Sequence, residues 1–189
     1  MNMIKLPKGW KAMHKPTNKE LCEDDLAKFL KTYFPFVFTE EWTPSQINAI
    51  KKIQNSILTG EMFSAKFNRG EGKTSLCLYS SIWALLFVHR KNVVVVVDNK
   101  VSVNELIRSF KMEHENNELW RYDFPTDDYR YNIFTAITKK QFNGYGGGFK
   151  YLKQNGETYP PDYVLVDDFH IGENESGIII GGDIIRNAK

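Results

Sequence analysis

Apolar residues near the start of the chain recur at the spacing of two helices. In the segment 20–34 the apolar side chains fall at helical intervals, at Leu26, Phe29, Leu30 and Tyr33. Pro35 cannot continue a helix and ends this pattern. Thr43, the proline after it and Gln46 have the spacing of a capping box. We predict a short amphipathic helix over 20–34 and a second helix that begins at Thr43 and stops at Gly60.

Farther along the chain, short apolar runs alternate with helical patterns. The apolar runs, which predict strands, are Met62–Phe67, Val93–Val97, Asn132–Ile137 and Tyr163–Val166. Between them, helices are predicted over Gly72–His89 and over Val101–His114, where Ser102 opens a sequence with capping-box spacing. Five consecutive valines suit a strand covered on both faces, as in a parallel sheet. The alternation predicts an α/β fold, a mainly parallel central sheet flanked by helices and joined by right-handed crossovers.

The composition indicates one globular domain with a short N-terminal appendage. Its 189 residues, 42% of them hydrophobic, suffice for one core, and we divide them into an appendage over 1–40 and a main domain over 41–189. A net charge of +2 neither demands nor excludes nucleic acid as a partner. Cys22 and Cys77 lack metal-ligand spacing and are interpreted as reduced thiols. No signal peptide or membrane-spanning run is recognisable, so we expect a soluble intracellular protein.

A glycine-rich segment between the first predicted strand and the next helix carries the most specific chemistry. Its residues are Phe67-Asn68-Arg69-Gly70-Glu71-Gly72-Lys73-Thr74. Glycines let backbone N–H groups turn toward a phosphate, and the start of the helix adds partial positive charge. Lys73 would reach the β- and γ-phosphates of ATP, and the Thr74 hydroxyl would ligate Mg²⁺. Phe67 stands where the usual phosphate loop has glycine, which leaves open a glycine turn with an incidental Gly-Lys-Thr.

The last predicted strand ends in two acids, Asp167 and Asp168. In a nucleotide hydrolase the first acid of such a pair holds Mg²⁺ through water, and the second orients or deprotonates the attacking water. Many strands end in aspartate merely because it suits a turn. Together with the glycine-rich segment, however, the pair predicts an Mg²⁺·ATP site.

The segment Arg69–Thr74 resembles the phosphate loop of bacteriophage and prophage terminase large subunits, in which an arginine four positions before the lysine is characteristic and the first glycine is often absent. Further blocks resemble the consecutive motifs of that family, in its order: Ser81–Leu86 with His89-Arg90, Val93–Val97, Asn117–Leu119 with Asp123–Pro125, and Asn155–Glu157 with Pro161–Asp168. The resemblance covers roughly residues 25–189.

This resemblance implies a P-loop NTPase of the additional-strand, conserved-glutamate type that drives double-stranded DNA into a procapsid. It implies a nucleotide site made of Arg69, Gly70, Glu71, Gly72, Lys73, Thr74 and Ser75. In it Arg69 contacts the γ-phosphate as a sensor or finger, while Trp42 and Gln46 contact adenine. Alternatively, Gln46 serves only the capping box and Trp42 only as a hydrophobic staple. The implied partners are DNA, held weakly, a portal protein, a small terminase subunit and further copies in a ring, without a membrane, in the host bacterial cytoplasm.

Two departures from the family pattern keep other functions open. Asp168 stands where most members have the longer glutamate, which implies slower hydrolysis. We also expect the C-terminal part of the ATPase and the nuclease domain to lie outside these residues, and hence no nuclease activity. The alternatives are a superfamily 2 helicase-like ATPase fragment, which usually has Asp-Glu at this strand end, and a non-catalytic nucleotide-binding assembly module.

Overall fold

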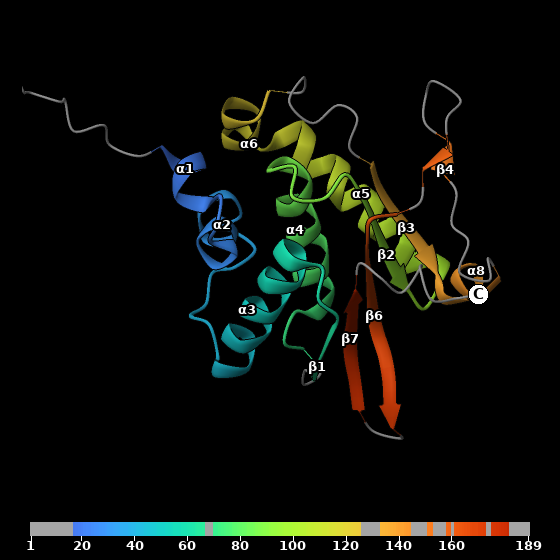
Figure 1. Ribbon diagram of the computed structural model, residues 1–189. Coiled ribbons are helices and arrows are strands. Elements are labelled where there is room, and N and C mark those ends of the chain that lie inside the picture. The colour runs from blue at the N-terminus through green and yellow to red at the C-terminus, as the bar shows by residue number, and fades with distance from the viewer. Residues whose placement is uncertain are drawn as a thin grey trace, which may run out of the picture.

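Within the described residues, five strands form one sheet that has helices on both faces (Figure 1). The computed structural model describes residues 17–66, 70–125, 133–144, 151–152, 158–159, 161–172 and 175–181. Its helices are α1 (Asn18–Cys22), α2 (Leu26–Tyr33), α3 (Pro44–Thr59), α4 (Lys73–Leu86), α5 (Lys100–Asn116), α6 (Glu118–Asp123) and α8 (Lys139–Gly144). Its strands are β1 (Phe63–Lys66), β2 (Asn92–Val97), β3 (Ile133–Thr138), β4 (Tyr151–Leu152), β5 (Thr158–Tyr159), β6 (Tyr163–Gly172) and β7 (Glu175–Gly181). Over these ranges every helix is too short or too polar to span a lipid bilayer.

The strands of the sheet lie in the order β1-β7-β6-β2-β3. β2 pairs in parallel with β3 on one side and with β6 on the other. β7 pairs antiparallel with both β6 and β1, so β1 runs in the same direction as β6. The chain is therefore an α/β protein with a mostly parallel sheet flanked by helices, as the alternating pattern predicts.

Two apolar layers cover the two faces of this sheet. The odd-numbered valines of β2, from Val93 to Val97, belong to the large core that α4 and α5 cover. Val94 and Val96 belong to a smaller core on the opposite face, against which α8 packs Phe142. Every residue of β2 is buried, which confirms the prediction of a strand covered on both sides.

The N-terminal segment forms two helices where one helix was predicted over 20–34. α1 begins after Thr17, whose side chain makes a complete capping box with Glu20. The chain then turns, and the Asp25 carboxylate caps α2 by accepting a hydrogen bond from Lys28 N at 2.9 Å. An N-cap residue has extended, non-helical dihedral angles. Asp25 therefore divides the single helix that the apolar spacing predicts into α1 and α2. α2 packs against both α3 and α4, and its apolar face joins the large core.

The helix α3 agrees closely with its prediction. The capping box between Thr43 and Gln46 is complete, and Pro44 lies in the first turn. Gly60 follows the helix with φ of 83°, a left-handed conformation that strains any residue with a Cβ. The buried residues Ile50, Ile53 and Ile57 form the face that packs inward.

α4 and α5 occupy their predicted regions but end at different residues. α4 lies inside the predicted range Gly72–His89, and α5 extends beyond the predicted range Val101–His114 at both ends. The side chain that caps α5 belongs to Asn99, which accepts a hydrogen bond from Ser102 N at 3.0 Å. The capping role predicted for Ser102 is therefore wrong, because an asparagine three residues earlier supplies the acceptor.

Five of the described elements have no counterpart among the predictions: α6, α8, β4, β5 and β7. α6 is a short helix capped by Asn117, whose side chain accepts a hydrogen bond from Trp120 N at 3.0 Å. β7 pairs with β6, which continues well past the predicted end at Val166 as far as Gly172. Figure 1 shows the two strands as a long hairpin that reaches beyond the rest of the sheet.

Candidate functional site

The glycine-rich segment joins the edge strand β1 to the start of α4. Gly70 has φ of 90° and Gly72 has φ of 77°, both in the left-handed region. A Cβ at either position would meet no atom within 4 Å, so the backbone angle is the reason for glycine here. Gly72 is the N-cap of α4 and has no side chain to cap the first N–H groups of the helix. Phe67, Asn68 and Arg69 lie outside the described residues, so the predicted contact of Arg69 has no structural counterpart here.

A hydrogen bond connects the first turn of α4 to β6. The Thr74 hydroxyl donates to Asp167 Oδ2 over 2.5 Å, although the two residues are 93 positions apart in sequence. Asp167 is 4% exposed, whereas Thr74 lies at the surface. The pair therefore places a buried carboxylate behind an accessible hydroxyl, beside the glycine-rich loop.

The register of β6 against β2 puts Asp167 at this position. Asp162 fixes one end of β6, because its carboxylate accepts hydrogen bonds from Lys91 N at 2.8 Å and from Asn92 N at 2.9 Å. Parallel pairing with β2 then runs as far as Val166. Asp167 comes next, at the carboxyl edge of the parallel strands, where α/β proteins commonly bind ligands. By the two-residue period of a strand it shares the α4 side of the sheet with Leu165.

Asp167 and Asp168 coincide with an irregularity in β6. Opposite β7, Val166 pairs with Ile179 and Phe169 pairs with Gly177, so β6 has one residue more than its partner between these two pairs. This is the count of a β-bulge, a feature that redirects side chains and is frequent beside active sites. The backbone of Asp168 thus lies inside β6, whereas its side chain lies outside the described part of the chain.

Cys77 shows that Lys73 and Asp167 act electrostatically on the same small region. Cys77 lies one turn after Lys73 on α4 and is fully buried. Burial raises the pKa of the Cys77 thiol well above its ordinary value, the negative charge of Asp167 raises it further, and the positive charge of Lys73 lowers it. The lysine at the start of α4 and the carboxylate at the edge of the sheet therefore both act on the charge state of the same buried thiol.

The start of α3 lies against the glycine-rich loop. Gln46 Nε2 donates a hydrogen bond to the backbone oxygen of Glu71 at 3.1 Å, and the Ser45 hydroxyl donates to Glu71 Oε1 at 3.0 Å. Sequence patterns did not predict the Ser45 contact, because the spacing of residues around Ser45 contains no information about a loop that follows β1. Trp42 packs on Phe38, with ring centroids 5.2 Å apart, and Lys31 Nζ lies 4.9 Å from the centre of the indole ring.

The oxygen donors near the loop suit a magnesium ion better than a transition metal. Mg²⁺ prefers oxygen ligands and typically takes one or two from the protein, with water and phosphate filling the rest. The Thr74 hydroxyl and the Asp167 carboxylate have this chemistry. Over the described ranges, no three histidine, cysteine, aspartate or glutamate side chains gather as a larger metal cluster would require. Ser75, half-buried in the same turn, adds a further hydroxyl.

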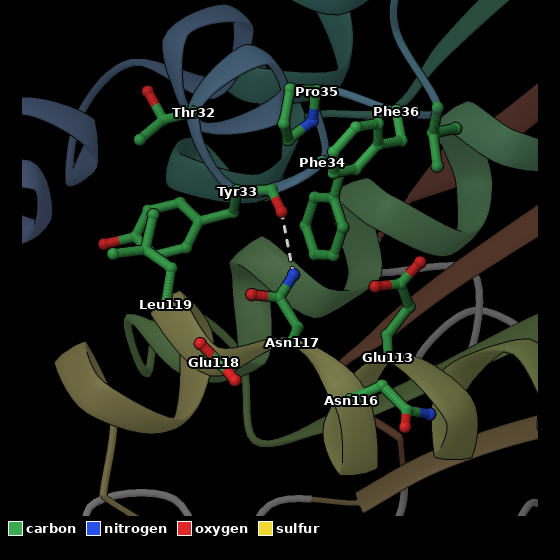
Figure 2. Close-up of a pocket in the computed structure, with 11 residues that line it drawn as sticks. Thr32, Tyr33, Phe34, Pro35, Phe36, Glu113, Asn116, Asn117, Glu118 and Leu119 are labelled. Atoms are coloured by element: carbon green, nitrogen blue, oxygen red, sulfur yellow. Dashed lines mark hydrogen bonds between the residues drawn. The ribbon is translucent and has the colours of Figure 1, made fainter.

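A separate pocket of about 500 Å³ lies between the end of α2 and the junction of α5 with α6 (Figure 2). It is lined by residues 32–37 together with Glu113 and residues 116–119. Across it, Asn117 Nδ2 donates a hydrogen bond to the backbone oxygen of Tyr33 at 2.7 Å. None of the side chains predicted to bind nucleotide lines this pocket. Sequence patterns gave no indication of it, because it forms between segments that are remote in the chain.

Comparisons of the chain with protein-family models, with curated proteins and with solved structures find no match. The chemistry of the site follows from three groups of residues that the fold brings together. These are the loop glycines Gly70 and Gly72, Lys73 and Thr74 at the start of α4, and Asp167 at the edge of the sheet.

Proposed function

We propose that this chain binds Mg²⁺·ATP at the loop from Gly70 to Ser75 and hydrolyses it. We further propose that it is the ATPase core of a DNA-packaging motor of the terminase large-subunit type. The first part is supported by side-chain geometry, and the second by the resemblance of the motifs between Arg69 and Asp168.

The hydrogen bond between Thr74 and Asp167 carries the proposal. A glycine turn with an incidental Gly-Lys-Thr gives no reason for the threonine to meet a buried carboxylate at the carboxyl edge of a parallel sheet. In P-loop hydrolases such a hydroxyl and such a carboxylate lie on either side of the magnesium ion. The long sequence separation of the two residues makes an accidental pairing a poor explanation.

Each residue of the site has a distinct proposed role. Lys73 lies at the start of α4, where its positive charge and the helix N–H groups attract the β- and γ-phosphates. Thr74 and Asp167 supply the oxygens that hold Mg²⁺, which when bound neutralises charge on the phosphate oxygens. Asp168 orients or deprotonates the attacking water. By the resemblance, Arg69 contacts the γ-phosphate and Trp42 the adenine ring.

The order of the strands, but not the direction of β7, supports a fold of the additional-strand type. One strand, β7, lies between β1, which leads into the loop, and β6, which carries Asp167. β7 runs antiparallel to both neighbours as the second arm of a hairpin. We propose the P-loop NTPase class on this order together with the loop geometry.

The proposed setting of the motor follows from the resemblance alone. The partners are double-stranded DNA, a portal protein, a small terminase subunit and further copies of the chain in a ring. The proposed place of action is the host bacterial cytoplasm, at the portal of the procapsid.

Phosphate release from ATP tests the proposal directly. We expect Mg²⁺-dependent turnover by the parent chain and a loss on the order of 10²–10³-fold in Lys73→Ala, since a fixed cation facing the transferring phosphoryl group is removed. Lys52→Ala, which changes an exposed lysine on α3, is the matched control and is expected to keep parental turnover. Equal turnover by parent and Lys73→Ala would refute the assignment. Binding of Mg²⁺·ATP without turnover would favour the non-catalytic assembly module.

A further inference from the structure

Glu71 is held by two side chains from the start of α3. It lies between Gly70 and Gly72, both with positive φ, so it is the only residue with a side chain at positions 70–72. Ser45 bonds its carboxylate and Gln46 bonds its backbone oxygen. We call these two hydrogen bonds the α3 clamp.

The α3 clamp extends from a firmly packed part of the molecule. α3 is fixed by its capping box at one end and by buried isoleucines along its inner face. It contacts α2, α4 and β1. Two glycines by contrast give the loop a wide choice of backbone conformations. The hydrogen bonds from the start of α3 to Glu71 restrict the loop to the conformation seen in the structure.

The amide of Gln46 is already engaged at both of its polar atoms. Oε1 accepts a hydrogen bond from Thr43 N at 3.0 Å, and Nε2 donates to Glu71. A glutamine that recognises adenine through paired hydrogen bonds presents both atoms to the edge of the base. In this structure one atom points into the capping box and the other into the loop. The arrangement favours a role through the loop over the direct adenine contact expected from the resemblance.

We propose that the α3 clamp positions the loop for the polyphosphate chain of its ligand, and that Gln46 does not read the base. This inference rests on the proposed nucleotide site, and it specifies which residues outside the loop determine the affinity of the loop for phosphates. Ser45 and Gln46 are then positioning residues, which act through Glu71. Loss of the clamp weakens binding of any ligand that presents the same phosphates, whether or not it has a base.

Two ligands distinguish an effect of the α3 clamp on phosphate binding from an effect on adenine binding. They are Mg²⁺·ATP and Mg²⁺·tripolyphosphate, which has the phosphates but no adenine. Binding of both is measured by titration calorimetry for the parent chain and for Ser45→Ala and Gln46→Glu. Glutamate at the third helical position still accepts from Thr43 N, so Gln46→Glu keeps the capping box while it removes the donor to Glu71. Asn48→Ala, at an exposed position of the same helix, is the matched control. Ser45→Thr, which retains the hydroxyl, is the rescue variant.

We expect Ser45→Ala and Gln46→Glu to weaken both ligands by the same factor, about tenfold for each lost hydrogen bond. Asn48→Ala and Ser45→Thr retain parental affinity, and unchanged circular dichroism shows that the variants fold. A variant that weakens ATP and leaves tripolyphosphate unaffected overturns the inference in favour of base recognition, as does parental affinity in both clamp variants. A parent chain that binds neither ligand overturns the proposed function as well, so the two failures are distinguishable.

Discussion

The hydroxyl of Tyr163, the first residue of β6, donates a hydrogen bond to Ser56 Oγ of α3 over 3.2 Å in the interior of the molecule. Ser56 in turn donates to the backbone oxygen of Glu61 at 2.6 Å. The guanidinium of Arg90 lies 5.6 Å from the centre of the tyrosine ring. The strand that carries Asp167 and the helix that contacts the glycine-rich loop are thus joined away from the site itself, which fixes the relative position of both parts.

Tyr163→Phe tests the contribution of this bond to stability. The substitution keeps the ring and removes the hydroxyl, so we expect the free energy of unfolding to fall by about 1 kcal/mol. The measurement is urea unfolding followed by tryptophan fluorescence. Tyr122→Phe is the control, because Tyr122 is 85% exposed and its hydroxyl has ample access to water. Equal losses of stability in the two variants would contradict a specific role for the Tyr163 bond.

Three buried tyrosines predict a loss of stability at alkaline pH. Burial is the main cause that raises the pKa of Tyr33, Tyr79 and Tyr163 above its ordinary value. The carboxylate of Asp123 raises the pKa of Tyr33 further, and that of Glu113 raises the pKa of Tyr79 further. A raised pKa in the folded state means that the unfolded chain releases these protons first, from about pH 10.

The contribution of these three tyrosines to stability is therefore retained below about pH 10 and lost as the pH rises above it, by about 1.4 kcal/mol per pH unit for each tyrosine. The buried Cys77 thiol, whose pKa is likewise raised, begins to lose its contribution at a lower pH. Urea unfolding at a series of pH values between neutral and strongly alkaline measures this slope. In Tyr79→Phe the slope of the unfolding free energy against pH is expected to be smaller by about 1.4 kcal/mol per pH unit, the contribution of one tyrosine. A free energy of unfolding that stays level through this range would show that these hydroxyls ionise as easily in the folded chain as in the unfolded one.

The two adjacent acids of β6 are expected to differ in their effects. Asp167→Asn removes charge from the carboxylate that bonds Thr74, so it should weaken Mg²⁺-dependent nucleotide binding. Asp168→Asn should keep nucleotide affinity and lower turnover by ~10²–10⁴-fold, as expected for loss of a general base. Calorimetry and a phosphate-release assay on both variants separate the two effects. The reverse pattern would indicate that Asp168, and not Asp167, is the ligand of the metal ion.

Asp168→Glu complements that comparison. Glutamate extends the carboxylate by one methylene, and it is the residue expected here if the resemblance to terminases reflects a common function. We expect Asp168→Glu to preserve turnover or raise it. Turnover as low as that of Asp168→Asn would indicate that the bulge admits only the shorter side chain.

The chain is expected to bind DNA weakly and to leave it uncut. The 25 lysines and arginines are nearly balanced by 23 acidic residues, so the net charge of +2 attracts phosphates only weakly. Affinity for duplex DNA should therefore be low and should fall as salt rises. Over the described ranges, no cluster of acids resembles a two-metal cutting site. Incubation of supercoiled plasmid with the purified chain and Mg²⁺ or Mn²⁺ should leave it intact. Cleavage that disappears in Asp127→Ala would contradict this expectation.

Local patterns predicted the parts of the fold that depend on neighbouring residues. The run from Val93 to Val97 predicted a doubly covered strand because burial on both faces tolerates no polar residue. The spacing of Thr43, Gln46 and Gly60 predicted α3, because caps act within a few residues. For the same reason the sequence indicated Lys73 and Thr74 at the start of α4.

Features that depend on distant pairing were not predictable in this way. Asp167 and Asp168 look like the end of a strand, yet β6 continues because β7 returns to pair with it across a bulge. Whether a strand extends through acidic residues depends on its partner, and a two-residue period contains no information about that partner. The bond from Ser45 to Glu71 likewise joins two segments whose local patterns are complete without it.

The position of β1 has a consequence for the order in which the chain is made. β1 lies at the edge of the sheet, and among the described strands its neighbour is β7, with Phe63 opposite Ile180. During synthesis from the N-terminus, α2, α3 and α4 leave the ribosome early and can pack together. β1 gains its partner only after the chain as far as Gly181 has emerged, since pairing between such remote segments waits for the later one. The loop that β1 leads into therefore acquires its final support only after β7 has been synthesised. A nascent chain lacking β7 would have the helical core in place before this site is complete.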